Sequence, residues 1–101
     1  MPDIEPERSR LIARVLEGKG VSSPAERRAA FDNTGPESAS TALVRKIAKN
    51  ARAVTESDVA AVRNSGVGED RIFEIVICAA LGEATRQYEA AMAAFERIGT
   101  A

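Results

Sequence analysis

Apolar residues recur with helical spacing along most of the chain, and glycine, proline and capping residues divide the pattern into five segments. Within each segment the apolar positions lie three or four residues apart, as one face of an α-helix requires. No segment alternates apolar and polar residues as a half-buried strand would, so no strand is predicted. The predicted helices span about residues 4–17, 23–31, 37–53, 55–66 and 69–98.

Local signals mark where two of these helices begin and where one ends. Ser23 precedes Glu26 by three positions, the spacing of a capping box in which each residue bonds the backbone of the other. Thr55 and Asp58 repeat this spacing one helix later. Gly66 suits the left-handed position that follows many helix ends.

The fifth predicted helix changes character along its length. From Ile72 to Leu81 it is apolar on every side except at Glu74, and a helix that is apolar all round is expected to be buried all round. Beyond Gly82 the apolar residues narrow to one stripe. The sequence therefore predicts an all-α fold, a compact bundle of about five helices with a central buried helix near residues 69–98.

Length and composition favour one small domain that associates with itself. A chain of 101 residues forms a single domain, here residues 1–101. It has no Trp, one Tyr and three Phe, so its helices bury little apolar area each, and assembly into a homo-oligomer would add burial. The net charge of −1, with acids and bases interspersed, gives no indication of nucleic-acid or membrane partners.

The cysteine count, the first ten residues and the length of the longest apolar run indicate the cellular location. The one cysteine cannot form a disulfide within the chain. The first ten residues lack the apolar segment of a signal peptide, and the apolar run from Ile75 to Leu81 is too short to cross a bilayer. A cytoplasmic protein is therefore expected.

The order of several short motifs in residues 42–95 points to a family. A helix with a Val-Thr-x-x-Asp-Val start ends in glycine, and an Ile-Phe-Glu helix, a small-residue stretch and an arginine follow, at Val54–Val59, Gly66, Ile72–Glu74, Ala79–Gly82 and Arg86. This order resembles the carboxymuconolactone decarboxylase / alkylhydroperoxidase D-like family. The resemblance implies an all-helical, oligomeric fold in which helices of neighbouring protomers build the core.

The chemistry of the family's peroxidase branch is missing from this chain. Those members use a Cys-x-x-Cys pair and a histidine just ahead of the glycine matched by Gly66. This chain has no histidine, its one cysteine is Cys78, and residues 51–59 hold neither residue type. Thiol peroxidase activity is not expected, because it needs an activated thiolate and a resolving partner. No cofactor or metal ion is expected either.

Four residues are weighed as site residues. Cys78, within an apolar run, is expected to be a small buried hydrophobe and not a redox centre. Glu74 is the weak candidate for a catalytic acid or base, or a ligand anchor; its alternative role is structural, bonded to a group on another helix or protomer. Arg86 and Tyr88 are weak ligand-binding candidates, with an interface pair as the alternative.

Three functions from different classes remain open on this basis. The first is an oligomeric scaffold or small-ligand binder. The second is an enzyme of the decarboxylase type, which without histidine would need a carboxylate such as Glu74 in a pocket between protomers. The third, a helix-turn-helix DNA-binding protein, is disfavoured because Glu69 and Asp70 would face the phosphates.

The cationic side chains of the third predicted helix could suggest an anion site. They lie away from the apolar stripe of that helix, at Arg45, Lys46, Lys49 and Arg52. A solvated face opposite a buried stripe is the expected role of such residues.

Overall fold

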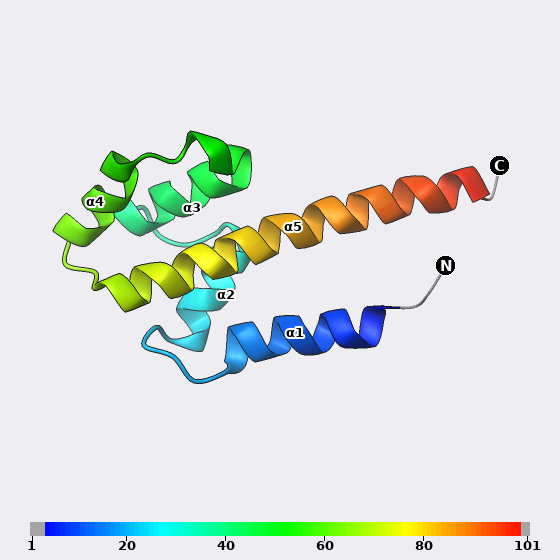
Figure 1. Ribbon diagram of the computed structural model, residues 1–101, viewed down its shortest axis with the longest axis horizontal. Coiled ribbons are helices and arrows are strands. Elements are labelled where there is room, and N and C mark those ends of the chain that lie inside the picture. Colours follow the sequence, from blue (N-terminus) through cyan, green and yellow to red (C-terminus); the bar gives the residue numbers. More distant parts are fainter. Residues whose placement is uncertain (1–3, 100–101) are drawn as a thin grey trace.

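The computed structural model describes residues 4–99, and they are helical apart from the connecting loops. No strand occurs within these residues, so the all-α prediction is confirmed. The elements are α1 (Glu5–Glu17), α2 (Pro24–Asp32), α3 (Ala39–Asn50), the 3-10 turn η1 (Ala51–Ala53), α4 (Glu56–Asn64) and α5 (Glu69–Gly99). Figure 1 shows α5 running the length of the molecule, with α2, α3 and α4 gathered around its first half.

Capping boxes start three of the helices. The predicted pairs Ser23–Glu26 and Thr55–Asp58 form as expected, each side chain bonding the backbone of the other residue. A third box at the start of α3 is made by Ser38 and Thr41, where a helix start near residue 37 was predicted. Gly66 has φ +101°, the left-handed conformation predicted for it after α4.

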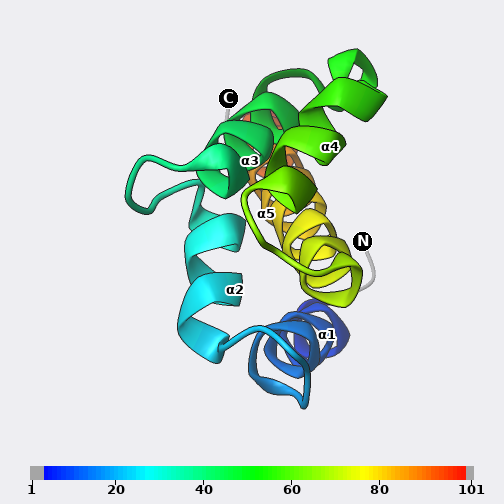
Figure 2. The ribbon, with the colours of Figure 1, turned by 90° about the vertical axis from the view of Figure 1, so that its left-hand side faces the viewer.

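The core lies between α2, α3 and the first half of α5. Its buried apolar side chains come from every α-helix: Leu16, Ala30, Phe31, Leu43, Val44, Ile47, Val62, Ile72, Ile75, Cys78 and Ala79. In the end-on view of Figure 2, α2 lies to the left of α5, α3 and α4 lie above it and α1 lies below it. The right-hand side of α5 carries no helix of the described chain in that view.

The prediction that α5 is buried on all sides from residue 72 to residue 81 is wrong for the single chain. Phe73 is 64% exposed and Ile77 is 38% exposed, although Ile72, Ile75 and Cys78 are buried. The four other helices are too short to surround α5, so one of its sides faces solvent. The apolar residues on that side are available for a contact outside the chain.

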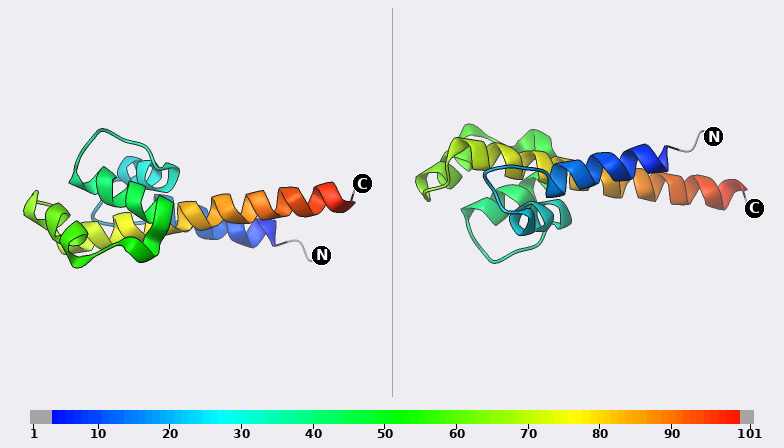
Figure 3. Two further views of the ribbon diagram at one scale, coloured as in Figure 1. Left: turned by 90° about the horizontal axis from the view of Figure 1, so that it is seen from above. Right: turned by 90° about the horizontal axis from the view of Figure 1, so that it is seen from below.

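The second half of α5 extends beyond the core, accompanied only by α1. Figure 3 shows the two helices side by side from above and from below. The described chain measures 52 × 29 × 21 Å as a result. The guanidinium of Arg8 on α1 lies 4.8 Å from the centre of the Tyr88 ring, and an ion pair of 3.8 Å joins Arg8 to Glu89. These contacts hold α1 against the projecting part of α5.

The helices α2 and α5 approach each other closely at Gly82. A β-carbon at this position would lie 2.0 Å from the carbonyl oxygen of Phe31, near the end of α2. Only a residue without a side chain allows this distance. The same carbonyl accepts a hydrogen bond of 2.7 Å from the guanidinium of Arg86, one turn further along α5.

Candidate functional site

Glu74 binds the loop between α1 and α2. Its Oε2 accepts a hydrogen bond of 2.9 Å from the Val21 backbone N–H. Its Oε1 accepts bonds of 2.8 Å from the Ser22 N–H and 2.5 Å from the Ser22 hydroxyl. The sequence interpretation placed the partner on another helix or protomer; it lies instead on a loop of the same chain, and its donors are mainly backbone groups.

These hydrogen bonds keep Glu74 ionised. The Ser22 hydroxyl, followed by the Val21 and Ser22 N–H groups, lowers the pKa of the Glu74 carboxyl from its usual 4.5 to about 2. A general acid or base for neutral pH needs a pKa near 7, and this shift is in the opposite direction for a carboxyl. The arrangement therefore makes Glu74 a clamp on the loop.

Gly20 makes room for this clamp. A β-carbon on Gly20 would lie 2.7 Å from Oε1 of Glu74, closer than a side chain tolerates without movement. Ser22 is buried at the same place, 3% exposed. The sequence Gly20-Val21-Ser22 thus presents two adjacent N–H groups and a hydroxyl to one carboxylate, in the manner of a small anion-binding loop.

Arg86 and Tyr88 do not join Glu74 in a common site. Arg86 bonds the Phe31 carbonyl and also contacts Glu83, with an N–O distance of 3.1 Å. Tyr88 lies under Arg8 of α1. Twelve residues of helix separate Glu74 from Arg86, about 18 Å at 1.5 Å per residue. The three side chains each fasten a different part of the chain to α5.

Cys78 is a free cysteine in the core, 1% exposed. Burial raises the pKa of its thiol, which keeps it protonated at neutral pH.

The cations of α3 are partly paired: Arg45 lies 2.7 Å from Glu37 and Lys46 lies 2.8 Å from Asp58.

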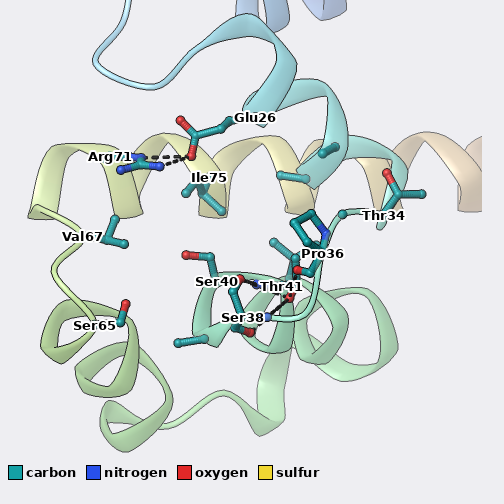
Figure 4. Close-up of a pocket in the computed structure, with 15 residues that line it drawn as sticks. Glu26, Thr34, Pro36, Ser38, Ser40, Thr41, Ser65, Val67, Arg71 and Ile75 are labelled. Carbon is teal, nitrogen blue, oxygen red and sulfur yellow. Dashed lines mark hydrogen bonds and ion pairs between the residues drawn. The ribbon is translucent and has the colours of Figure 1, made fainter.

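A cavity of about 550 Å³ lies between α2, α3, α5 and the loops that join α2 to α3 and α4 to α5. Apolar side chains form most of its wall, among them Ala30, Val44, Val67 and Ile75. Figure 4 shows the Val67 and Ile75 side chains and the Ser40 hydroxyl directed into the space. This volume is within the range of cavities that hold small organic molecules.

One ion pair borders the cavity. Arg71 of α5 donates from Nε to Oε2 of Glu26 over 2.9 Å, and its Nη2 makes a second bond to the same oxygen (Figure 4). The guanidinium lowers the pKa of the Glu26 carboxyl. Glu26 also belongs to the capping box of α2, so this pair ties α2 to α5 at the cavity edge. Sequence reasoning found the capping role of Glu26 but not the cavity, because its walls come from separate segments.

A stripe of exposed residues follows α5 for nearly its whole length. Successive positions are three or four residues apart and fall within an arc of about 80° on a helix of 3.6 residues per turn. We call it the α5 stripe; its members are Phe73, Ile77, Ala80, Ala84, Gln87, Ala91, Phe95 and Ile98, all exposed. Gln87 is the single polar member.

Comparison with known proteins identifies no relative of this chain. No protein-family model matches it, and neither a curated protein nor a solved structure is detectably similar. The resemblance to the decarboxylase-like family therefore rests on the motifs of the sequence alone. Across residues 4–99, no helix is long and apolar enough to span a membrane. The same residues contain no group of three or more acidic or cysteine side chains placed to hold a metal ion.

Proposed function

We propose that this protein is a helical domain of the carboxymuconolactone decarboxylase-like type, without thiol peroxidase chemistry, that acts as a self-associating scaffold. The observation that carries the proposal is the α5 stripe. An exposed apolar row of this length is costly in an isolated soluble chain and is typical of an interaction surface. Its steps of three or four residues are those of a helix that packs along another helix.

The residues of the α5 stripe suit a second copy running in the opposite direction. Bulky side chains stand at both ends, Phe73 and Ile77 at one and Phe95 and Ile98 at the other, with alanines between them. An antiparallel pair centred between residues 85 and 86 places Phe73 opposite the Ile98 position of the second copy. In the middle, Ala84 then faces Gln87 and Ala80 faces Ala91, so small side chains let the helices approach closely.

The charges at the ends of α5 favour the same orientation. Glu69 and Asp70 lie in its first turn and Arg97 lies in its last. An antiparallel arrangement brings Glu69 and Asp70 of one helix near the end of the other, which carries Arg97 beside Glu96, and it also opposes the helix dipoles favourably. A parallel arrangement would place like charges together.

We predict that the wild-type protein is a dimer at micromolar concentration and that Ala91→Glu separates it. A carboxylate buried without a partner costs several kcal/mol, so the dissociation constant of the dimer should rise at least about 100-fold. Light scattering coupled to size-exclusion chromatography measures the mass. Ala93→Glu is the matched control, because Ala93 is exposed on the same part of α5 outside the stripe and should leave the dimer intact. A monomeric wild type, or equal dissociation by both variants, contradicts the proposal.

The large cavity supports a second function, the binding of a small amphipathic molecule. Its wall is mainly apolar, the Arg71–Glu26 pair is already satisfied, and the Ser40 hydroxyl has no hydrogen-bond partner among the described residues. These properties fit a neutral, mostly apolar ligand with one hydrogen-bonding group.

The neutral fluorescent amine N-phenyl-1-naphthylamine is expected to bind the cavity once per chain, with brightened emission that saturates. Ala39→Trp should weaken this binding at least about tenfold, because Ala39 lines the cavity and an indole would occupy much of it. The control is Ala42→Trp, at an exposed position of the same helix that is not part of the lining. Equal binding by both variants would show that the probe sits elsewhere.

A further inference from the structure

A buried arginine has no carboxylate partner. Arg27 of α2 is 4% exposed. Its Nη1 donates a long hydrogen bond, 3.4 Å, to the Val15 carbonyl, and its Nε–H has no partner within the described residues. None of the ion pairs found among those residues involves Arg27. The Glu74 carboxylate acts on this guanidinium through its charge without forming an ion pair. The buried Nε–H still lacks an acceptor, and a buried donor without one is unfavourable.

Arg27 borders a second cavity, of about 220 Å³, with two further cations in its wall. Arg14 comes from α1 and Lys19 from the loop after it, and neither has an ion-pair partner among the described residues. Three residues with positive side chains, from separate segments, therefore line one space. Such a grouping of positive charges concentrates anions from solution.

The one carboxylate in this wall is already occupied. Glu74 accepts the hydrogen bonds of Val21 and Ser22 with both oxygens, and its single negative charge, which Arg27 also stabilises, offsets only one of the three positive charges. Three positive groups and one negative group leave an excess of two positive charges. A dianion with several acceptor oxygens matches this excess, and guanidinium donors bind such oxygens with favourable geometry.

We propose that this cavity binds a phosphate group, either inorganic phosphate or the phosphate of a small monoester. Arg27 supplies a buried guanidinium in the wall, and the exposed residues Arg14 and Lys19 supply further positive charge. The bound phosphate would also fix the end of α1, the loop after it and α2 with respect to each other. The site is separate from the large cavity and does not require a second copy of the chain.

Titration with inorganic phosphate at neutral pH and constant ionic strength, followed by ¹⁵N NMR of the arginine side chains, tests this site. The Arg27 Nε–H signal should shift and saturate. The double variant Arg14→Gln/Lys19→Gln should weaken binding at least tenfold while leaving the buried Arg27 in place. The matched control Arg10→Gln/Lys49→Gln removes the same charge types from exposed positions outside the cavity and should bind as the wild type does.

Glycerol 3-phosphate, titrated in the same way, distinguishes the two sources. Tighter binding than that of inorganic phosphate indicates a monoester, and equal binding indicates the free ion; either result supports the site. An Arg27 signal that does not move with either compound overturns the proposal. Equal weakening in the double variant and in its matched control also overturns it, because that result would reflect general surface attraction.

Discussion

Replacing Gly82 by alanine should destabilise the protein by about 2 kcal/mol, because the added methyl group collides with the backbone of α2. The new β-carbon would lie 2.0 Å from the Phe31 carbonyl oxygen. A backbone atom cannot rotate away, so α2 must move as a unit from α5. That movement would also stretch the 2.7 Å hydrogen bond from Arg86 to the same carbonyl. This expected loss already includes the roughly 0.5–1 kcal/mol by which alanine stabilises a helix interior relative to glycine.

Urea denaturation followed by far-ultraviolet circular dichroism measures this loss. In a thermal melt followed by the same signal, this loss should appear as a melting temperature lower by about 10 °C. Gly99→Ala is the control, because a β-carbon at Gly99 meets no atom within 4 Å. An unchanged stability of Gly82→Ala would mean that α2 and α5 pack less closely than described.

Features that depend on a few neighbouring residues could be predicted from the sequence. Both predicted capping boxes form, and Gly66 has the left-handed conformation predicted for it after α4. The start of α3 was placed near Glu37, just before the true cap, Ser38. Such signals are reliable because donor and acceptor lie within one helical turn, so tertiary packing has little influence on them.

The environment of α5 could not be predicted in the same way. An apolar pattern shows which positions avoid water, but not whether the same chain covers them. Phe73 and Ile77 are large and apolar, as are Ile72 and Ile75, yet the first two are exposed and the others are buried. The difference arises from how many helices the chain has to place around α5, which is a property of the whole fold.

Long-range polar contacts were also beyond the sequence pattern. Fifty-two residues separate Ser22 from Glu74, and their bond depends on how the loop after α1 crosses α5. No sequence pattern marked Arg27 as buried, yet it is 4% exposed. Gly82 could be recognised as small, but its close neighbour on α2 could not be foreseen.

Substitution of Glu74 by alanine is expected to release the loop between α1 and α2. The Val21 and Ser22 N–H groups and the Ser22 hydroxyl would all lose their acceptor. An orphaned buried donor is destabilising, so the melting temperature should fall by several degrees. Amide hydrogen exchange at Val21 and Ser22 should accelerate more than exchange in α3. Unchanged exchange at these two amides would contradict the clamp.

A structural glutamate that used only one oxygen would tolerate glutamine, but the geometry of Glu74 predicts otherwise. Both carboxylate oxygens accept hydrogen bonds, and an amide replaces one acceptor by an NH₂ donor. One loop donor would then face another donor, so Glu74→Gln should also lower the melting temperature. Glu96→Gln, at an exposed position of the same helix, should not.

The pH dependence of stability separates the clamp from other roles of Glu74. Its pKa is lowered on folding from 4.5 to about 2, so the unfolded chain binds the proton more readily. The stabilisation is therefore complete above about pH 5 and is lost as the pH falls towards 2. Glu74→Gln has no such proton to bind, so its melting temperature should fall less than that of the wild type across this range. Parallel pH profiles for the two proteins would exclude the ionised clamp, because only a carboxylate held by the loop donors makes acid selectively harmful at this position.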